Sequence, residues 1–376
     1  MPDIGTTLIF ANGQALRMSQ NRCDLPSTDL RTLFFENNLS LPSGQLFFAV
    51  GASNIAQRNR LRNRSELPQR AFSLSVGVVV GSSTDEWMFT SHRGQRGMDE
   101  PRKYDVIIDR ISQDIQFYRA FLKQAVMQGT VVVNNPFWWT ADDKFFNYSL
   151  AHKIGVAIPP TVILPHNKHP EGTTEQSMRN LIYPLNWQEI FDYIGFPAFL
   201  KPYSGGGWKH VYKVHSPEEF FHNYNQTGDL CMTLQRGVEF EEYYRCYVVG
   251  QEKVHIMKYD PKLPHHERYV KGNPPPSSKA LQDRIEKDAL TLCRVLGYDL
   301  NTVEFAVEKG VPYAIDFLNP APDAEVTSVG QENFDWIVNA VAEMATKLAQ
   351  SGASPAREMR WAEFLKGTDA PKAKSR

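Results

Sequence analysis

The sequence lacks the features of several common protein classes. Its four cysteines are scattered singly, so no pair has the spacing of a metal or redox motif, and disulfides are not expected. No apolar run approaches the length that crosses a bilayer, and the N-terminus lacks the charged-then-apolar pattern of a signal peptide. These absences predict a cytoplasmic protein with no membrane partner.

There is no excess of one charge sign either. The 41 lysines and arginines oppose 42 aspartates and glutamates, giving a formal net charge of −1 that favours no nucleic-acid partner. One basic run, Arg58 to Arg64, contains no aromatic residue and is typical of a solvated loop. The composition of the 376 residues, 42% hydrophobic and 22% charged, predicts about two or three compact globular units.

The most informative stretch is residues 303–320. Apolar residues alternate on two arms with a Lys-Gly turn between them, which predicts a β-hairpin. Glu304 lies on the first arm, Asp316 on the second, and Asn319 just beyond its end. Two carboxylates and an amide oxygen are ligands that magnesium, or manganese in its place, prefers beside a nucleotide phosphate. The alternative, a solvated acidic hairpin, fits Glu308 better than Asp316, because Asp316 is embedded in an apolar run.

A glycine-rich loop upstream could hold that phosphate. The strand predicted at 198–202 contains Lys201, and Gly205, Gly206 and Gly207 follow before the next strand. Consecutive glycines allow left-handed backbone angles and let bare amides approach phosphate oxygens. The strand–loop–strand setting excludes a P-loop or Rossmann turn, since both lead into a helix. The alternative is a flexible hairpin tip, but a lysine at its root favours phosphate binding.

Two other basic residues stand out. Thr140 is predicted to cap a helix at 141–152, which puts Lys144 in the first turn, where a lysine opposes the helix dipole. Arg245 lies inside a strand and needs an anionic partner, either a structural carboxylate or a transferring phosphoryl group. Further upstream, the strand–helix–strand order over 105–133 predicts a parallel sheet. Residues 1–100 show only short strand-like runs, at 7–11, 46–50 and 74–80.

The order of these parts resembles the ATP-grasp superfamily, most closely its RimK-type and glutathione-synthetase-like carboxylate–amine ligases. The resemblance implies an α/β (α+β) fold in which two α+β subdomains hold ATP between them, after a parallel α/β pre-grasp domain. The matching stretches are 142–161, 199–211, 234–250 and 303–323, and 107–135 is similar to the end of a pre-grasp domain. The predicted domains are 1–135, an ATP-grasp domain at 136–350 with a lid at about 160–235, and a flexible polar tail at 351–376.

The resemblance also implies a role for individual residues. Lys144 and Lys201 would hold the ATP phosphates, and Gly205, Gly206 and Gly207 would form the loop over them. Gln235, Arg236 and Val238 would belong to the hinge that meets adenine, and Glu242 would meet ribose. Arg245 would lie near the γ-phosphate, and Glu304, Asp316 and Asn319 would hold magnesium. The family usually has Glu at the position of Asp316 and often Asp at that of Glu304, which shifts each carboxylate by about 1.5 Å.

The implied reaction joins a small-molecule carboxylate to an amine, such as an amino acid or peptide, with release of ADP and phosphate. Arg110 and Arg268 are candidates for holding the substrate carboxylate, on charge and position. The sequence shows no Ser/His/Asp or Cys/His constellation, which fits chemistry that needs little protein acid–base catalysis. Two alternatives stay open, a small-molecule kinase on the same scaffold and an ATP-binding protein without turnover. A homodimer is expected by analogy with the resembled families.

Overall fold

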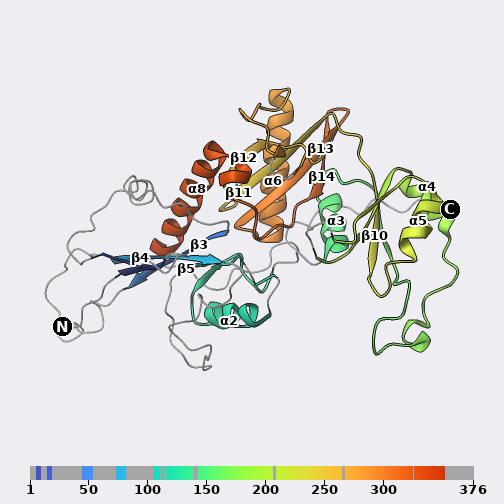
Figure 1. The fold of residues 1–376 in the computed structure, drawn as a ribbon, viewed down its shortest axis with the longest axis horizontal. Coiled ribbons are helices and arrows are strands. Elements are labelled where there is room, and N and C mark those ends of the chain that lie inside the picture. Colours follow the sequence, from blue (N-terminus) through green and yellow to red (C-terminus); the bar gives the residue numbers. More distant parts are fainter. Residues whose placement is uncertain are drawn as a thin grey trace.

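The structure is a computed structural model (Figure 1). It describes four strand backbones in the first hundred residues and most of the chain from 106 to 351. The four strands are β1 (Thr6–Ile9), β2 (Ala15–Met18), β3 (Gln45–Ser53) and β4 (Ser73–Gly81), and the later part omits residues 111, 114–115, 139–142, 206–208, 265–266 and 325. The strands predicted at 7–11, 46–50 and 74–80 overlap β1, β3 and β4.

The N-terminal sheet has the strand order β4-β3-β5-β6. The predicted strand–helix–strand unit is confirmed, because β5 (Val106–Ile108) runs parallel to β6 (Val131–Val133) and α2 (Gln116–Met127) connects them. β3 pairs antiparallel with both β4 and β5, so the sheet as a whole is mixed rather than parallel. Only the pair joined by a crossover helix has to be parallel.

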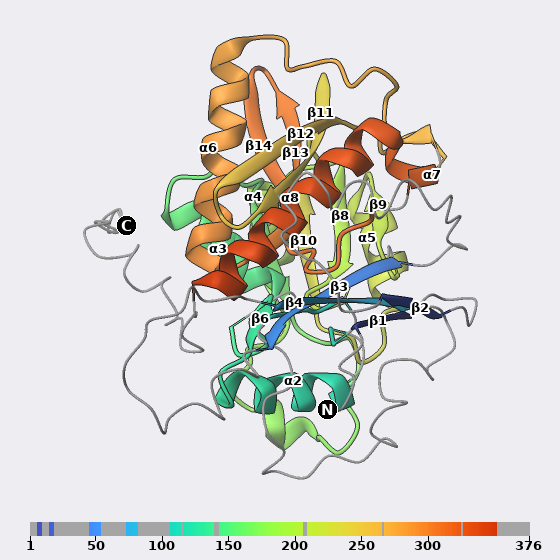
Figure 2. The same cartoon turned by 90° about the vertical axis from the view of Figure 1, so that its left-hand side faces the viewer.

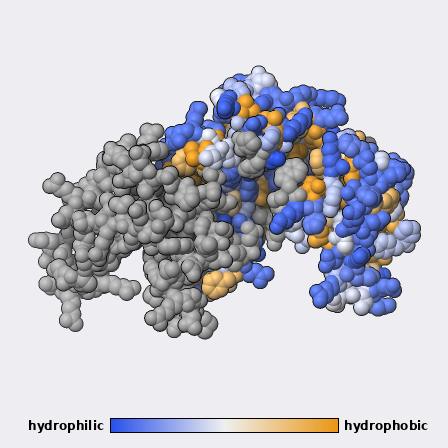
Figure 3. All heavy atoms as spheres, viewed as in Figure 1, coloured by the Kyte–Doolittle hydropathy of each residue, from blue (hydrophilic) through white to orange (hydrophobic). Residues whose placement is uncertain are grey.

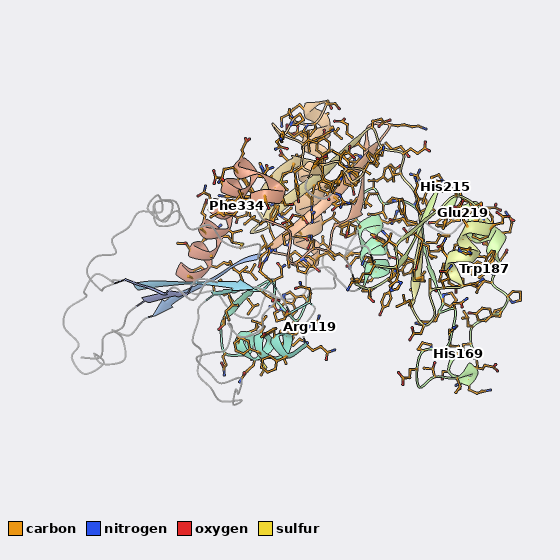
Figure 4. All side chains as sticks on the ribbon, viewed as in Figure 1. Arg119, His169, Trp187, His215, Glu219 and Phe334 are labelled. Carbon is orange, nitrogen blue, oxygen red and sulfur yellow. The ribbon has the colours of Figure 1, made fainter. Side chains whose placement is uncertain are left out.

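A second, antiparallel sheet forms the lobe that we term the lid. Its strand order is β7-β10-β8-β9, with β7 at Thr161–Leu164, β8 at Ala198–Pro202, β9 at Tyr212–Val214 and β10 at Met232–Arg236. Two helices, α4 (Trp187–Ile194) and α5 (Pro217–Tyr224), pack on it through an aromatic cluster around Trp187. Ser216 caps α5 and accepts a hydrogen bond from the N–H of Glu219, a residue labelled in Figure 4.

The connection between β7 and α4 extends away from the lid sheet. It contains His169 and a short 3₁₀ helix, η2 (Glu175–Met178), and Figure 4 shows His169 well apart from Trp187. His166 is half-buried and His169 is exposed, as expected for a polar, Pro- and Gly-containing loop.

The third sheet forms the lobe that we term the body. Its antiparallel order is β12-β11-β13-β14, with β11 at Glu242–Val249, β12 at Lys253–Lys258, β13 at Leu300–Glu308 and β14 at Val311–Asp316. Helices α6 (Lys279–Leu296) and α8 (Gln331–Gln350) cover its opposite faces, and α7 (Val326–Val329) precedes α8 (Figures 1 and 2). Side chains along β11 alternate between these faces, Tyr243 toward α8 and Tyr244 toward α6.

The α8 side of the body shares its core with the N-terminal sheet, because Val106 and Val133 belong to the same buried cluster as Tyr243. Asn134 fastens the two units. Its Oδ1 accepts from the N–H groups of Asp299 and Leu300 at 2.8 and 2.9 Å, and its Nδ2 donates to the Leu300 carbonyl at 2.7 Å. All of these groups are buried, so the contact fixes the start of β13 against the N-terminal sheet.

Helix α3 (Lys144–Lys153) lies between body and lid (Figure 1). The predicted cap, Thr140, is wrong: the helix begins at Lys144, and the Asp143 carboxylate accepts from the Phe146 N–H at 3.0 Å. Asp is as good a cap as Thr, and it stands one residue before the helix, where the free N–H groups are. Lys144 is in the first turn, as predicted.

The predicted α/β (α+β) class is confirmed, with two α+β lobes preceded by a smaller α/β unit. The surface of body and lid that faces the viewer in Figure 3 is largely hydrophilic. Within the described residues, no helix combines the length and the apolar character needed to cross a membrane.

Candidate active site

The predicted hairpin exists, and a β-bulge decides where its acids point. Glu304 pairs with Asp316, whereas the next residue, Phe305, pairs with Ala314, so Ile315 is an extra residue in β14. In a regular register Glu304 would oppose Ile315, and Asp316 would point to the other face of the sheet. The bulge therefore brings the carboxylates of Glu304 and Asp316 to the same side of the body sheet.

Glu304 sits among groups that hold it in place. The Tyr243 hydroxyl donates to its Oε2 at 2.5 Å, and the Arg245 Nε lies 3.6 Å from its Oε1. Burial raises the pKa of Glu304, Arg245 lowers it, and the nearby Asp316 carboxylate raises it again. Asp316 itself is exposed. Two acids that repel each other at a partly buried position would be stabilised by a cation between them.

Asn319, the third predicted ligand, lies in the loop after β14, which Asn301 holds. The buried Asn301 side chain accepts from the Asn319 N–H at 2.8 Å and donates to the Phe317 carbonyl at 2.7 Å. Sequence analysis missed Asn301, which lies near the start of the strand that carries Glu304. Within the described residues, no group of three His, Cys, Asp or Glu side chains is placed to hold a metal ion, so the predicted site depends on an amide as its third ligand.

Replacing Asn301 by alanine is expected to destabilise the chain and weaken the site together. The change leaves the Asn319 N–H and the Phe317 carbonyl without their partners, which costs about 2–4 kcal/mol of unfolding free energy for two buried hydrogen bonds. Chemical denaturation would measure this loss. Thr291→Ala is the control, because its hydroxyl only bonds the Lys287 carbonyl within α6 and the residue is half-buried. An unchanged denaturation midpoint for Asn301→Ala would contradict the role given to this side chain.

Two lysines approach the acids from the other lobe and from α3. Lys201, in the lid, donates to Gln235 Oε1 at 2.9 Å and to the Tyr148 hydroxyl at 2.8 Å. Burial lowers the pKa of Lys201 to about 8, Asp316 and Glu304 raise it, and Lys144 lowers it further. These mutual effects show that the structure brings the four predicted charges within electrostatic reach of one another.

The root of the glycine loop lies beside Lys144. The Lys144 backbone N–H donates to the Tyr203 carbonyl at 2.9 Å, and its Nζ donates to the Gly205 carbonyl. Gly205 has a φ of 84°, so this position requires the left-handed conformation that glycine adopts without strain. Gly206 and Gly207 lie outside the described residues.

The predicted hinge, residues 235–238, is anchored at two backbone amides. Arg236 N–H donates to the Pro160 carbonyl at 2.9 Å, and Gly237 N–H donates to that of Pro197 at 2.7 Å. A Cβ at Gly237 would stand 2.7 Å from the Pro197 oxygen, so only glycine fits this close approach. Within the described part of the chain, the Val238 N–H donates no hydrogen bond, which leaves one hinge donor for a ligand.

The hinge is also clamped to the hairpin turn. Glu308 accepts from Arg236 Nη1 at 3.1 Å and from the Glu239 N–H at 2.8 Å. The Arg236 guanidinium packs over the Tyr313 ring at 5.3 Å. Glu308, which the sequence analysis left out of the metal site, therefore ties the two lobes together at their junction.

Glu242, predicted to meet ribose, is engaged elsewhere. Its carboxylate accepts from the Ser277 hydroxyl at 2.6 Å and N–H at 3.2 Å, from the Tyr244 hydroxyl, and lies 3.5 Å from Lys258 Nζ. These partners lie on the α6 side of β11, opposite to Glu304. Its role in ribose binding stays a prediction.

Three arginines predicted to meet anions lie on the Glu304 side of the body sheet. The half-buried Arg245 donates from Nη2 to Thr302 Oγ1 at 3.4 Å. The charge of Arg268 lowers the pKa of Glu304, which places Arg268 near the acid pair. Arg110 is buried and hydrogen-bonds Tyr247 of β11. The structure thus brings Arg110 and Arg268, which are distant in sequence, to the region around Arg245.

Comparison with known sequences gives a partial match. No family model matches the chain. It is 27% identical over 143 residues to mitochondrial pyruvate carboxylase from Mus musculus, and equally to that from Rattus norvegicus. The match covers 34% of this chain and only 12% of the length of these curated relatives.

Similar solved structures are D-alanine ligases by name. VanG D-Ala:D-Ser ligase from Enterococcus faecalis has a TM-score of 0.48 at 15% identity, over 66% of this chain and 73% of its own. D-alanine–D-alanine ligase from Bacillus anthracis, complexed with ATP, has 0.47 at 15%, over 67% and 82%. The same ligase from Coxiella burnetii has 0.48 at 12%, over 66% and 70%. At these values the similarities assign no role to any residue of this chain.

Proposed function

We propose that the chain is an ATP-dependent carboxylate–amine ligase of the ATP-grasp superfamily, of the RimK or glutathione-synthetase type. One observation carries the proposal: Lys144 and Lys201 lie within electrostatic reach of Glu304 and Asp316, where two α+β lobes meet. Two cations suit the phosphates of ATP, and two acids suit a divalent metal ion that neutralises them.

Different residues would bind the phosphates, the adenine and the magnesium ion of magnesium–ATP. Lys144 and Lys201 would hold the phosphates, with the loop that begins at Gly205 above them. The open N–H of Val238 suits an adenine nitrogen. Glu304, Asp316 and Asn319 would hold Mg²⁺, which fits the repulsion between the two carboxylates. When bound, the cation neutralises charge on the phosphoryl oxygens.

The reaction proposed has two steps. An oxygen of the substrate carboxylate attacks the γ-phosphorus of ATP in line, the bond to the β,γ-bridging oxygen breaks, and ADP leaves. The amine then attacks the acyl carbon and loses a proton, and the C–O bond to the phosphate breaks to give an amide and free phosphate. Arg245 stabilises the charge that develops on the phosphoryl and acyl oxygens. The remaining task of the fold is to exclude water, because a leaked acyl-phosphate would hydrolyse.

The test is to supply magnesium–ATP with a pool of amino acids, dipeptides and other small acids and to measure ADP, phosphate and product masses. A ligase releases ADP and phosphate only with a carboxylate, and gives a product equal to the two substrates less one water. ADP with a phosphorylated product would identify a small-molecule kinase instead. ADP release that needs no carboxylate would rule out the ligase, and bound ATP with no turnover of any tested acid would favour a binding protein.

ATP affinity is expected to fall above pH 8. Burial lowers the pKa of Lys201 to about 8, so its ammonium group is present below that pH and is progressively lost above it. Because bound phosphate favours the charged form, the affinity should fall by up to about tenfold per pH unit above 8. Isothermal titration of ATP between about pH 7 and 10 measures the profile. Lys201→Arg keeps its charge over this range and should flatten the curve; a wild-type profile equally flat would contradict the assignment.

A further inference from the structure

Two buried polar atoms on the Glu304 side of the body sheet have no hydrogen-bond partner among the described residues. One is Nε of Arg245, which faces Glu304 Oε1 at 3.6 Å, beyond hydrogen-bond distance, and the other is the hydroxyl of Tyr269, a residue only 9% exposed. Buried donors are normally satisfied, because an unmet one costs the full desolvation of the group. Two such atoms in one region therefore indicate a place where a ligand completes the bonding.

The two residues meet at the ring of Tyr259. The Arg245 guanidinium lies 5.7 Å from the centre of this ring, and the ring of Tyr269 makes a T-shaped contact with it, with centroids 5.0 Å apart. Tyr259 and Tyr269 also form a backbone bridge, supported by the Asp260 N–H, which donates to the Arg268 carbonyl at 2.8 Å. Tyr269 is therefore held beside Arg245 by the backbone as well as by packing.

The chemistry of these two atoms indicates which ligand suits them. Burial raises the pKa of Tyr269, although Arg245 lowers it, so the phenol remains a donor at neutral pH. A guanidinium and a phenol are both donors, so an anion with two acceptor oxygens suits them. A carboxylate has that geometry, and it is the group that the proposed function must place next to Glu304 and the γ-phosphate.

The two arginines favoured on sequence grounds are less suited to this task. Arg268 donates to the Leu263 carbonyl at 3.0 Å and to the Tyr259 hydroxyl at 3.4 Å, so it supports the segment that carries Tyr269. Arg110 bonds the Tyr247 hydroxyl, which itself lies 2.9 Å from the Pro322 carbonyl. Both arginines contribute positive charge around the site and hold the segments next to it through these hydrogen bonds.

We propose that Tyr269 and Arg245 together bind the substrate carboxylate, with the guanidinium on one oxygen and the phenol on the other. The inference rests on the proposed function for the identity of the ligand, and it adds Tyr269 as a substrate-binding residue. It requires that the carboxylate be recognised even without ATP, since both donors belong to the body.

Acetate, the smallest stable carboxylate probe, tests the proposal on the full chain without ATP. Thermal unfolding in about 100 mM sodium acetate is compared with the same concentration of sodium chloride, because a ligand of the native state raises the unfolding temperature. The wild-type chain should unfold at a higher temperature in acetate. Tyr269→Phe should lose this shift, because the loss of one hydrogen bond to the charged acetate lowers the affinity for acetate by about tenfold or more. In chloride it should unfold no earlier than wild type, because its hydroxyl has no partner to lose.

Tyr224→Phe is the matched control. The Tyr224 hydroxyl donates to the Pro165 carbonyl in the lid at 2.6 Å, so this variant should unfold earlier but keep the acetate shift. A wild-type chain that responds equally to both salts, or a Tyr269→Phe variant that keeps the shift, would overturn the proposal. Failure of the ligase function would be seen separately, as an acetate shift in a chain that turns over no ATP. If a substrate is found, Tyr269→Phe should raise its KM by about tenfold or more and leave the KM for ATP unchanged.

Discussion

Asp316→Asn is expected to reduce ATP turnover by about a thousandfold or more. The change removes one of the two carboxylates that the bulge in β14 brings together. An asparagine keeps the size and one side-chain oxygen but loses the negative charge that acts on Lys201 and that, in the proposed function, would bind a divalent cation. Affinity for Mg²⁺ in the presence of ATP should fall with turnover, and titration with Mn²⁺ followed by electron paramagnetic resonance would measure binding independently of activity.

Two companion variants make this experiment specific. Asp283→Asn removes an exposed acid on α6 that pairs only locally with Lys279, and it should leave metal binding and turnover unchanged. Asp316→Glu keeps the charge and lengthens the reach by about 1.5 Å, so it should retain metal binding better than Asp316→Asn. If Asp316→Asn bound Mn²⁺–ATP as tightly as wild type does, the metal assignment would be wrong.

The hairpin shows how far sequence reasoning reaches. The alternation of apolar residues predicted both strands of the hairpin. The predicted Lys-Gly turn fits the positive φ values of 52° and 73° at Lys309 and Gly310. The facing of Glu304 and Asp316 was inferred from spacing alone, but a regular register would have separated them. The bulge that unites them has no distinct sequence signal, because Ile315 is an ordinary strand residue.

Contacts between distant segments were the least predictable. Asn301 and Asn134 each bond backbone groups far away in sequence, and a single buried amide does not reveal its partner. Tyr269 was not singled out because its segment, rich in Pro and His, suggests a substrate-side loop but carries no motif that marks one residue. Its significance lies in what it fails to bond, and only coordinates show an unmet hydroxyl.

Lys201→Met is expected to lower ATP turnover to an extent comparable with Asp316→Asn, for a different reason. The Lys201 ammonium group comes from the lid and lies within electrostatic reach of Asp316 and Glu304 in the body, so in the proposed reaction it would link the lobes through the phosphates of ATP. Methionine fills the same space without the charge. ATP affinity should fall by about tenfold to a hundredfold with the loss of one charged hydrogen bond, and turnover by about a hundredfold to a thousandfold. Calorimetry of ATP binding and an ADP assay would separate the two effects.

Lys213→Met supplies the control for this charge change. Lys213 lies on the neighbouring strand β9, is exposed, and should affect neither quantity when replaced. Because Lys201 also donates to Gln235 and Tyr148, Lys201→Met leaves two acceptors without a donor, so its unfolding temperature must be compared with that of wild type. A variant that folds normally and loses turnover but not ATP affinity would place Lys201 in the transition state alone. A variant that keeps both turnover and ATP affinity would show that Lys201 has only a structural role between the lobes. The proposed phosphate site would then have to lie elsewhere.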